Sequence, residues 1–82
     1  MLEIRVTRNV ELKSELRSSL DRIKADNGIW ILWPSREAAQ QTNISDHSVR
    51  KLALSLGLVD VETYVTDEYW HHRKFIFPKI KG

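Results

Sequence analysis

The strongest constraint on this chain is an unbroken run of apolar residues from Ile29 to Trp33. The turn signal Asn27-Gly28 precedes the run, and Pro34 follows it. The run is too short for a buried helix, and its β-branched and aromatic residues favour a strand. Because polar residues do not alternate with the apolar ones, we expect both faces of the strand to be covered, as in a central strand with helices packed on it. The other elements are therefore expected to pack around this strand.

The residues before this run have the pattern of a strand followed by a helix. Apolar and polar residues alternate over Leu2–Val6, which predicts a half-buried strand. Asn9 is expected to cap a helix, and Asn27-Gly28 to end it. The apolar stripe of that helix is Leu12, Leu16, Leu20 and Ile23. With the central strand these segments form a βαβ unit, in which the crossover is right-handed and the two strands are parallel.

A second helix is predicted after a polar, irregular segment over residues 34–41, which is expected to form a loop. Ser45 is the expected cap of this helix, and Ile44 and Val49 are spaced to form a hydrophobic staple around it. Gly57 should stop the helix, because glycine tolerates the left-handed conformation of the position after a C-cap.

The end of the chain is predicted to form a β-hairpin. Alternation over Val59–Thr66 predicts its first strand, followed by a turn at Asp67-Glu68. The second strand is expected over Lys74–Phe77, with a start as early as Trp70. The predicted order is β-α-β-α-β-β, in a single α/β domain that spans residues 1–82.

Three motifs after Gly28 indicate a relationship to known sequences. Residues 33–36 read Trp-Pro-Ser-Arg, residues 57–62 read Gly-Leu-Val-Asp-Val-Glu, and residues 65–75 read Val-Thr-Asp-Glu-Tyr-Trp-His-His-Arg-Lys-Phe. They resemble Trp-Pro-Lys-Lys, Gly-Leu-Val-Asp-Val-Lys and Val-Asp-Glu-x-Trp-Ser-x-Leu-Lys-Phe in a family of small bacterial proteins, a domain of unknown function. The chain departs from the family where Ser35 and Arg36 replace the two lysines, and where His-His-Arg replaces Ser-x-Leu. A polar site of the family at this strand–loop junction would therefore be changed here.

The shared part of that family is similar to the C-terminal half of a Rossmann-like methyltransferase. The resemblance implies a mixed four-stranded sheet of order 1-2-4-3, in which the last strand is antiparallel, with two helices packed on it. No Gly-rich turn follows the opening strand, so the cofactor-binding half is missing and no cofactor is expected. On this analogy the first strand also lacks its outer neighbour. Its free edge is a candidate docking site for a second copy or another partner, with Glu3, Arg5 and Thr7 as candidate interface residues.

The densest cluster of basic and aromatic residues lies near the C-terminus. The candidate partner-binding residues are the members of this cluster together with one residue of the loop after Pro34: Trp70, His71, His72, Arg73, Lys74 and Arg36. Interleaved cations and aromatic rings suit a phosphate backbone and stacked bases. The alternative is that the cluster is the solvated outer face of the hairpin. Adjacent histidines in a strand point to opposite faces, so a shared metal ion is not expected.

The three tryptophans, Trp30, Trp33 and Trp70, could form a set that stacks on a ligand. Tryptophans on a central strand and at the start of a hairpin more commonly belong to the core. We therefore expect all three to lie in the core.

Composition narrows the function only by exclusion. The chain contains no cysteine, which excludes disulfides and thiolate chemistry, and its formal net charge of +2 is too small to imply nucleic acid by itself. It has no apolar run long enough for a membrane span and no signal-peptide pattern, so a cytoplasmic location away from the membrane is expected.

The leading hypothesis is a small non-enzymatic binding or regulatory module that acts by protein–protein contact, with a homodimer as its simplest form. The alternatives are a nucleic-acid-binding protein that uses the basic aromatic segment, and a minimal enzyme at the loop after Pro34.

The central strand leads to a first testable prediction. If both of its faces are covered, Leu32→Ala should destabilise the protein by about 2–5 kcal/mol, the usual cost of removing a buried leucine side chain. Denaturant unfolding would measure this loss. A change below about 1 kcal/mol would mean that the strand has been misplaced.

Overall fold

Four strands and two helices form an α/β fold in the part of the chain that the computed structural model describes, residues 2–26, 28–35, 42–65 and 69–78. The elements are β1 (Leu2–Arg5), α1 (Asn9–Asp26), β2 (Ile29–Pro34), α2 (Asp46–Ser55), β3 (Val59–Val65) and β4 (Trp70–Ile76). The strands make one mixed sheet of order β1-β2-β4-β3. The predicted element order and sheet order are therefore confirmed.

β2 is a central strand with a neighbour on each edge. It pairs in parallel with β1 and antiparallel with β4, and β4 also pairs antiparallel with β3. Ile31 and Leu32 are 0% and 2% exposed, which confirms that they are buried. Trp30 is only half-buried, so the prediction was wrong for this residue.

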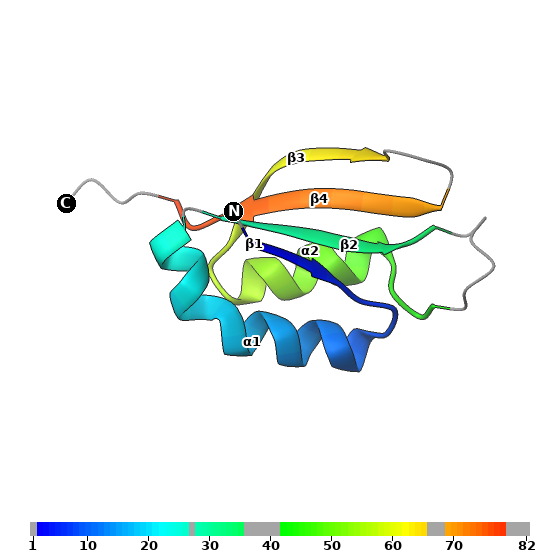
Figure 1. The fold of residues 1–82 in the computed structure, drawn as a ribbon, viewed down its shortest axis with the longest axis horizontal. Coiled ribbons are helices and arrows are strands. Elements are labelled where there is room, and N and C mark those ends of the chain that lie inside the picture. Colours follow the sequence, from blue (N-terminus) through cyan, green and yellow to red (C-terminus); the bar gives the residue numbers. More distant parts are fainter. Residues whose placement is uncertain (1, 27, 36–41, 66–68, 79–82) are drawn as a thin grey trace.

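Both helices lie on the same face of the sheet (Figure 1). The steps from β1 to β2 and from β2 to β3 advance in the same direction across the sheet, so two crossovers of the same hand place both helices on one face. Both faces of β2 were expected to be covered, and the structure shows that the helices cover only one of them. The core lies between the helices and the sheet, and its buried side chains include Leu12, Leu16, Ile23, Ile29, Ile31, Trp33, Val49, Ala53, Leu58 and Phe75.

Leu32 is buried on the face that carries no described helix, by its neighbours in the sheet. Arg5 of β1 and His72 of β4 stand directly opposite Leu32 in the register, one on each side. Trp30 and Pro34 lie two residues before and after it on β2, and therefore on the same face. These side chains of the sheet surround Leu32 on the helix-free side.

The predicted ends of α2 are confirmed. The Ser45 side chain accepts from the Ser48 backbone N–H, and the Ser48 side chain accepts from the Ser45 N–H, which makes a capping box. Ile44 and Val49 are both buried in the core, as the hydrophobic staple requires. Beyond the helix, Gly57 has φ +87°, a conformation that L side chains rarely adopt.

The C-terminus of α2 has the two hydrogen bonds of a Schellman motif. The Gly57 N–H donates to the Leu54 carbonyl at 3.1 Å, and the Leu58 N–H donates to the Ala53 carbonyl at 2.9 Å. These bonds engage carbonyls of the last turn of the helix and direct the chain into β3.

Asn9 is the first residue of α1 and does not cap it, which corrects the prediction. Its Nδ2 donates to the Asn43 carbonyl at 3.0 Å, and its Oδ1 accepts from Ser48 Oγ at 3.1 Å. The Asn9 side chain therefore ties the start of α1 to the start of α2.

A separate contact lies near the start of α1. The Thr7 hydroxyl and N–H donate to Glu11 Oε1 at 2.9 and 3.3 Å, and these hydrogen bonds lower the pKa of Glu11.

The turn between α1 and β2 depends on Gly28. α1 ends at Asp26, and the Gly28 N–H donates to the Ile23 carbonyl at 3.2 Å. Gly28 has φ +150°, and a Cβ atom there would lie 2.9 Å from the Phe75 carbonyl oxygen. A glycine at this position lets β4 pass close to the start of β2.

The hairpin differs from its prediction in two ways. Its second strand, β4, begins before Lys74, and its first strand, β3, is irregular. β4 begins at Trp70, the early limit of the predicted range. The register between β3 and β4 shifts between Asp60 and Glu62, which is a β-bulge. Val61 lies at this shift and is 46% exposed, so the predicted period-2 pattern is interrupted there. The predicted turn at residues 67 and 68 lies outside the described residues.

Candidate binding surface

The structure divides the predicted basic aromatic cluster between the two faces of the sheet. His71 and Arg73 stand opposite residues of β2 that face the helices. Trp70, His72 and Lys74 lie on the other face, because successive residues of a strand alternate. The cluster is therefore not one continuous surface, although its residues are adjacent in the sequence.

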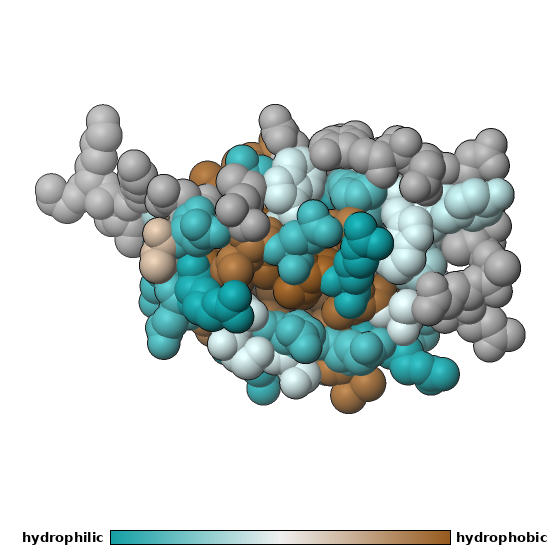
Figure 2. Space-filling view, in the orientation of Figure 1, coloured by the Kyte–Doolittle hydropathy of each residue, from teal (hydrophilic) through white to brown (hydrophobic). Residues whose placement is uncertain are grey.

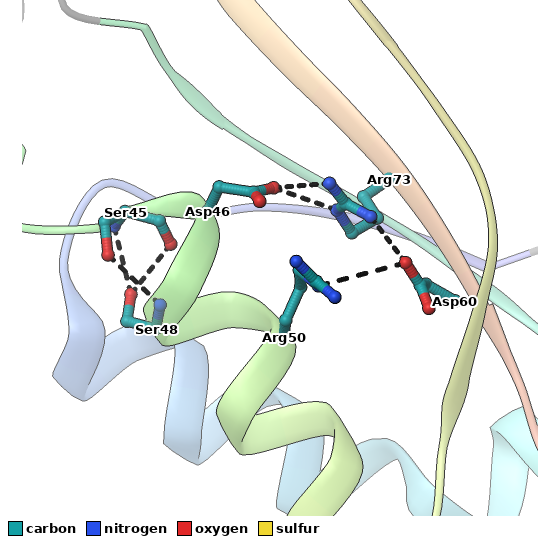
Figure 3. Close-up of polar contacts among 6 residues, drawn as sticks. All are labelled: Ser45, Asp46, Ser48, Arg50, Asp60 and Arg73. Carbon is teal, nitrogen blue, oxygen red and sulfur yellow. Dashed lines mark hydrogen bonds and ion pairs between the residues drawn. The ribbon is translucent and has the colours of Figure 1, made fainter.

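Arg73 is held inside the domain by two carboxylates (Figure 3). Its Nε and Nη2 donate to Asp46 Oδ1 at 3.0 and 2.6 Å, and its Nη1 donates to Asp60 Oδ2 at 2.6 Å. Arg50 Nε lies 4.0 Å from the same Asp60 oxygen. The Arg73 side chain is 11% exposed, whereas those of Asp46 and Asp60 are 50% and 39% exposed. Arg73 thus links β4 to the start of α2 and to β3, and is poorly placed to contact a partner.

His71 is also turned toward the helices. Its ring stacks on Trp33, with ring centroids 5.3 Å apart and planes inclined by 24°. Trp33 is 2% exposed, so the expectation that it belongs to the core is confirmed. The contact places His71 at the margin of the core.

The face of the sheet that carries no described helix has two cations that lie over tryptophan rings. The Arg5 guanidinium is 5.6 Å from the ring centroid of Trp70, and the Lys74 ammonium is 6.0 Å from that of Trp30. A cation over the face of a tryptophan is attracted by the negative charge of the ring face. Both tryptophans are half-buried on this face, which corrects the expectation that all three belong to the core.

The helix-free face consists of these side chains: Glu3, Arg5, Trp30, Leu32, Pro34, Trp70, His72 and Lys74. It takes residues from three strands, whereas the sequence prediction took only the residues of one. The sequence prediction did not use the alternation of side chains along each strand, which we call strand parity. Alternate residues of paired strands share a face. Parity groups Arg5 and Trp30 with the β4 residues only when the pairing register is known.

The outer edge of β1 is the second candidate surface. The Val6 N–H donates to the Leu32 carbonyl at 3.0 Å, so the backbone groups of even-numbered residues of β1 point toward β2. Those of Glu3 and Arg5 therefore point away from the sheet, and no strand of the described residues pairs with them. Arg5 Nε lies 3.5 Å from Glu3 Oε1, and both side chains are more than half exposed.

Apolar surface accompanies this edge. Leu2 and Ile4 are partly buried and pack against the core. Figure 2 shows hydrophobic surface in the middle of the view, in the region of β1, with hydrophilic side chains around it. A partner at this edge would meet both open backbone groups and apolar side chains.

Thr7, the third predicted residue of the edge, lies past the end of β1. Its carbonyl accepts from the Thr42 hydroxyl at 2.6 Å, and its own hydroxyl donates to Glu11. These contacts use its polar groups within the domain, so the open edge is formed by Leu2–Arg5.

The loop after Pro34 is described only at its start. Ser35 is 4% exposed, and its N–H donates to the Tyr69 carbonyl at 2.7 Å. Arg36, one of the predicted partner-binding residues, lies outside the described residues with most of this loop. The described part of the loop, Ser35, adds no residue to either candidate surface.

The described residues place further bounds on the site. No group of three or more of their His, Asp or Glu side chains is arranged to hold a metal ion. Neither of their helices is long and apolar enough to cross a membrane.

No protein-family model matches the chain, and neither does any curated protein or solved structure.

The two faces of β4 lead to a matched pair of variants. Arg73→Gln and Lys74→Gln remove the same charge from adjacent residues, but only the first breaks hydrogen bonds to Asp46 and Asp60. We expect Arg73→Gln to cost about 1.5–3 kcal/mol, the usual value for hydrogen bonds to charged groups. Lys74→Gln, at a half-buried position, loses only the contact with the Trp30 ring and should cost about 0.5–1 kcal/mol. Denaturant unfolding distinguishes them, and equal losses would contradict a structural role for Arg73.

Proposed function

We propose that this chain is a small non-enzymatic binding module that acts by protein–protein contact, through addition of a partner strand to the outer edge of β1. The observation that carries the proposal is the direction of the backbone groups of Glu3 and Arg5, which point away from β2. An open strand edge supplies a row of donors and acceptors that an extended segment of another protein can satisfy.

The side chains of β1 support the same interpretation. Glu3 and Arg5 are charged, but they lie on the helix-free face and so leave the hydrogen-bonding edge open. Natural sheets protect their edges with proline, bulges or inward-pointing charges. β1 has no proline and pairs in regular register with β2. A partner strand would also cover the exposed parts of Leu2 and Ile4, which continue the core toward this edge.

Proline at position 5 tests the strand-addition proposal. Arg5→Pro removes an N–H that faces outward, and proline is tolerated in an edge strand at such a position. Arg5→Gln is the matched control, because it removes the same charge and keeps the N–H. We expect proteins captured from a lysate of the source cells by the immobilised wild-type chain to be retained by Arg5→Gln and lost by Arg5→Pro.

Circular dichroism and a thermal melt of both variants would show that the fold is intact. If Arg5→Pro folds normally and captures the same proteins as Arg5→Gln, strand addition at β1 is not the mode of binding.

A second candidate function is binding of single-stranded nucleic acid on the helix-free face. The observation that favours it is the pair of cation–tryptophan contacts, Arg5 with Trp70 and Lys74 with Trp30. Exposed sheets with aromatic side chains bind RNA by stacking bases on the rings, and nearby cations contact the phosphates. On binding, bases would take the places of the cations over the rings, and the cations would move to the backbone.

Fluorescence anisotropy with a labelled 12-nucleotide oligo(U) tests this second candidate. Trp70→Ala should weaken binding by about 5- to 150-fold, the effect of losing one stacked base. Lys74→Gln should reduce the slope of the salt dependence by about 1. Lys13→Gln, the same change on the exposed side of α1, should leave both unchanged. Absence of binding at low salt, or equal effects of all variants, would exclude the helix-free face as a nucleic-acid site.

A further inference from the structure

The outward backbone groups restrict how any strand pairs with β1. In an antiparallel pair, two residues exchange hydrogen bonds only if the N–H and C=O of each point toward the other strand. In β1 these residues are Glu3 and Arg5, because Val6 and the other even-numbered residues point toward β2. If the partner is another copy of β1, an odd-numbered residue must therefore stand opposite an odd-numbered residue. A register shifted by one residue would oppose backbone groups that already belong to the β1–β2 ladder.

Charge then selects among the registers that remain. One places Glu3 opposite Glu3 of the copy, and another places Arg5 opposite Arg5. Like charges directly opposite each other on one face of a sheet are destabilising. The remaining register places Glu3 opposite the copy's Arg5 and, by symmetry, Arg5 opposite the copy's Glu3. This register puts opposite charges together at both positions.

We propose that the partner strand is β1 of a second copy of this chain, paired antiparallel about a twofold axis beside Ile4. This inference rests on the proposed function, since it names the partner that occupies the same edge. Each Glu3–Arg5 pair exchanges both backbone hydrogen bonds, and Ile4 meets its own copy on the helix side, where non-hydrogen-bonded pairs bring side chains closest. Ile4 is partly buried in the single chain, and the second copy buries the rest.

The pairing joins two four-stranded sheets into one continuous sheet. Because odd-numbered residues stand opposite odd-numbered residues, the helices of both copies lie on the same side. The helix-free faces of the two copies are then continuous with each other. Two contacts of Arg5 compete with the intermolecular pair. Its 3.5 Å contact with Glu3 joins two exposed side chains and contributes little, and its guanidinium also lies 5.6 Å from the centroid of the Trp70 ring.

Reversed charges test the register directly. Glu3→Arg and Arg5→Glu each place like charges opposite each other at both pairs, and each should raise the dimer dissociation constant by roughly tenfold or more. The double variant reverses both charges in the same chain, restores opposite charges at both pairs and should dimerise as the wild type does. An equimolar mixture of the two single variants should form a mixed dimer, because every pair between them is then complementary.

The measurement is solution mass by analytical ultracentrifugation over a concentration series up to about 1 mM, the range in which weak self-association is detected. Native mass spectrometry, with one variant carrying a short tag, identifies the mixed dimer. Lys74→Glu is the control: it makes the same charge change as Arg5→Glu on the helix-free face but away from the edge, and should leave the dimer unchanged. Because the mixed dimer rescues both single variants without further mutation, a folding defect cannot imitate this result.

Three results would overturn the inference: a wild-type chain that stays monomeric throughout the series, a dimer that neither single charge reversal weakens, or a dimer that persists in Arg5→Pro. A monomer whose captured partners are nevertheless lost in Arg5→Pro would overturn this inference alone and leave strand addition by a different protein. A dimer that obeys the charge rules supports the inference and the proposed function together.

Discussion

The domain depends on β2, a short apolar strand that must be hydrogen-bonded on both edges and covered on both faces. Its backbone donors and acceptors would be costly to bury unpaired, so it needs a strand on each side. β1 supplies one as its parallel partner, and β4 supplies the other by returning antiparallel from β3. The position of β4 inside the sheet follows, and β1 and β3 are left as the outer strands.

Arg73 determines which part of the basic segment is available for binding. Its guanidinium joins the first residue of α2 to β3, and its burial is offset by hydrogen bonds to Asp46 and Asp60. A carboxylate in the first turn of α2 is also favoured by the helix dipole. With Arg73 engaged in this way, the described cations of the helix-free face are Arg5 and Lys74, each over a tryptophan ring.

Arg5 belongs to both candidate surfaces, and this couples them. Its backbone lies on the open edge of β1, while its guanidinium lies 5.6 Å from the ring centroid of Trp70 on β4. If a strand pairs with β1 as proposed, a carboxylate placed opposite Arg5 would compete with Trp70 for the same guanidinium.

The local signals in the sequence were enough to determine the elements and most of their ends. The period-2 pattern of β1, the apolar run of β2, the Ser45 capping box and the glycine after α2 each act within a few residues, and the structure confirms them. The strand order followed from a resemblance and not from any local pattern, because pairing between distant segments leaves no mark within either one. Only tertiary structure decided that Asn9 bonds to Asn43 and Ser48, that Arg73 turns inward while Lys74 turns outward, and that a bulge exposes Val61. These outcomes depend on register and on which face the helices cover, and a one-residue change in register reverses the face of every side chain in a strand.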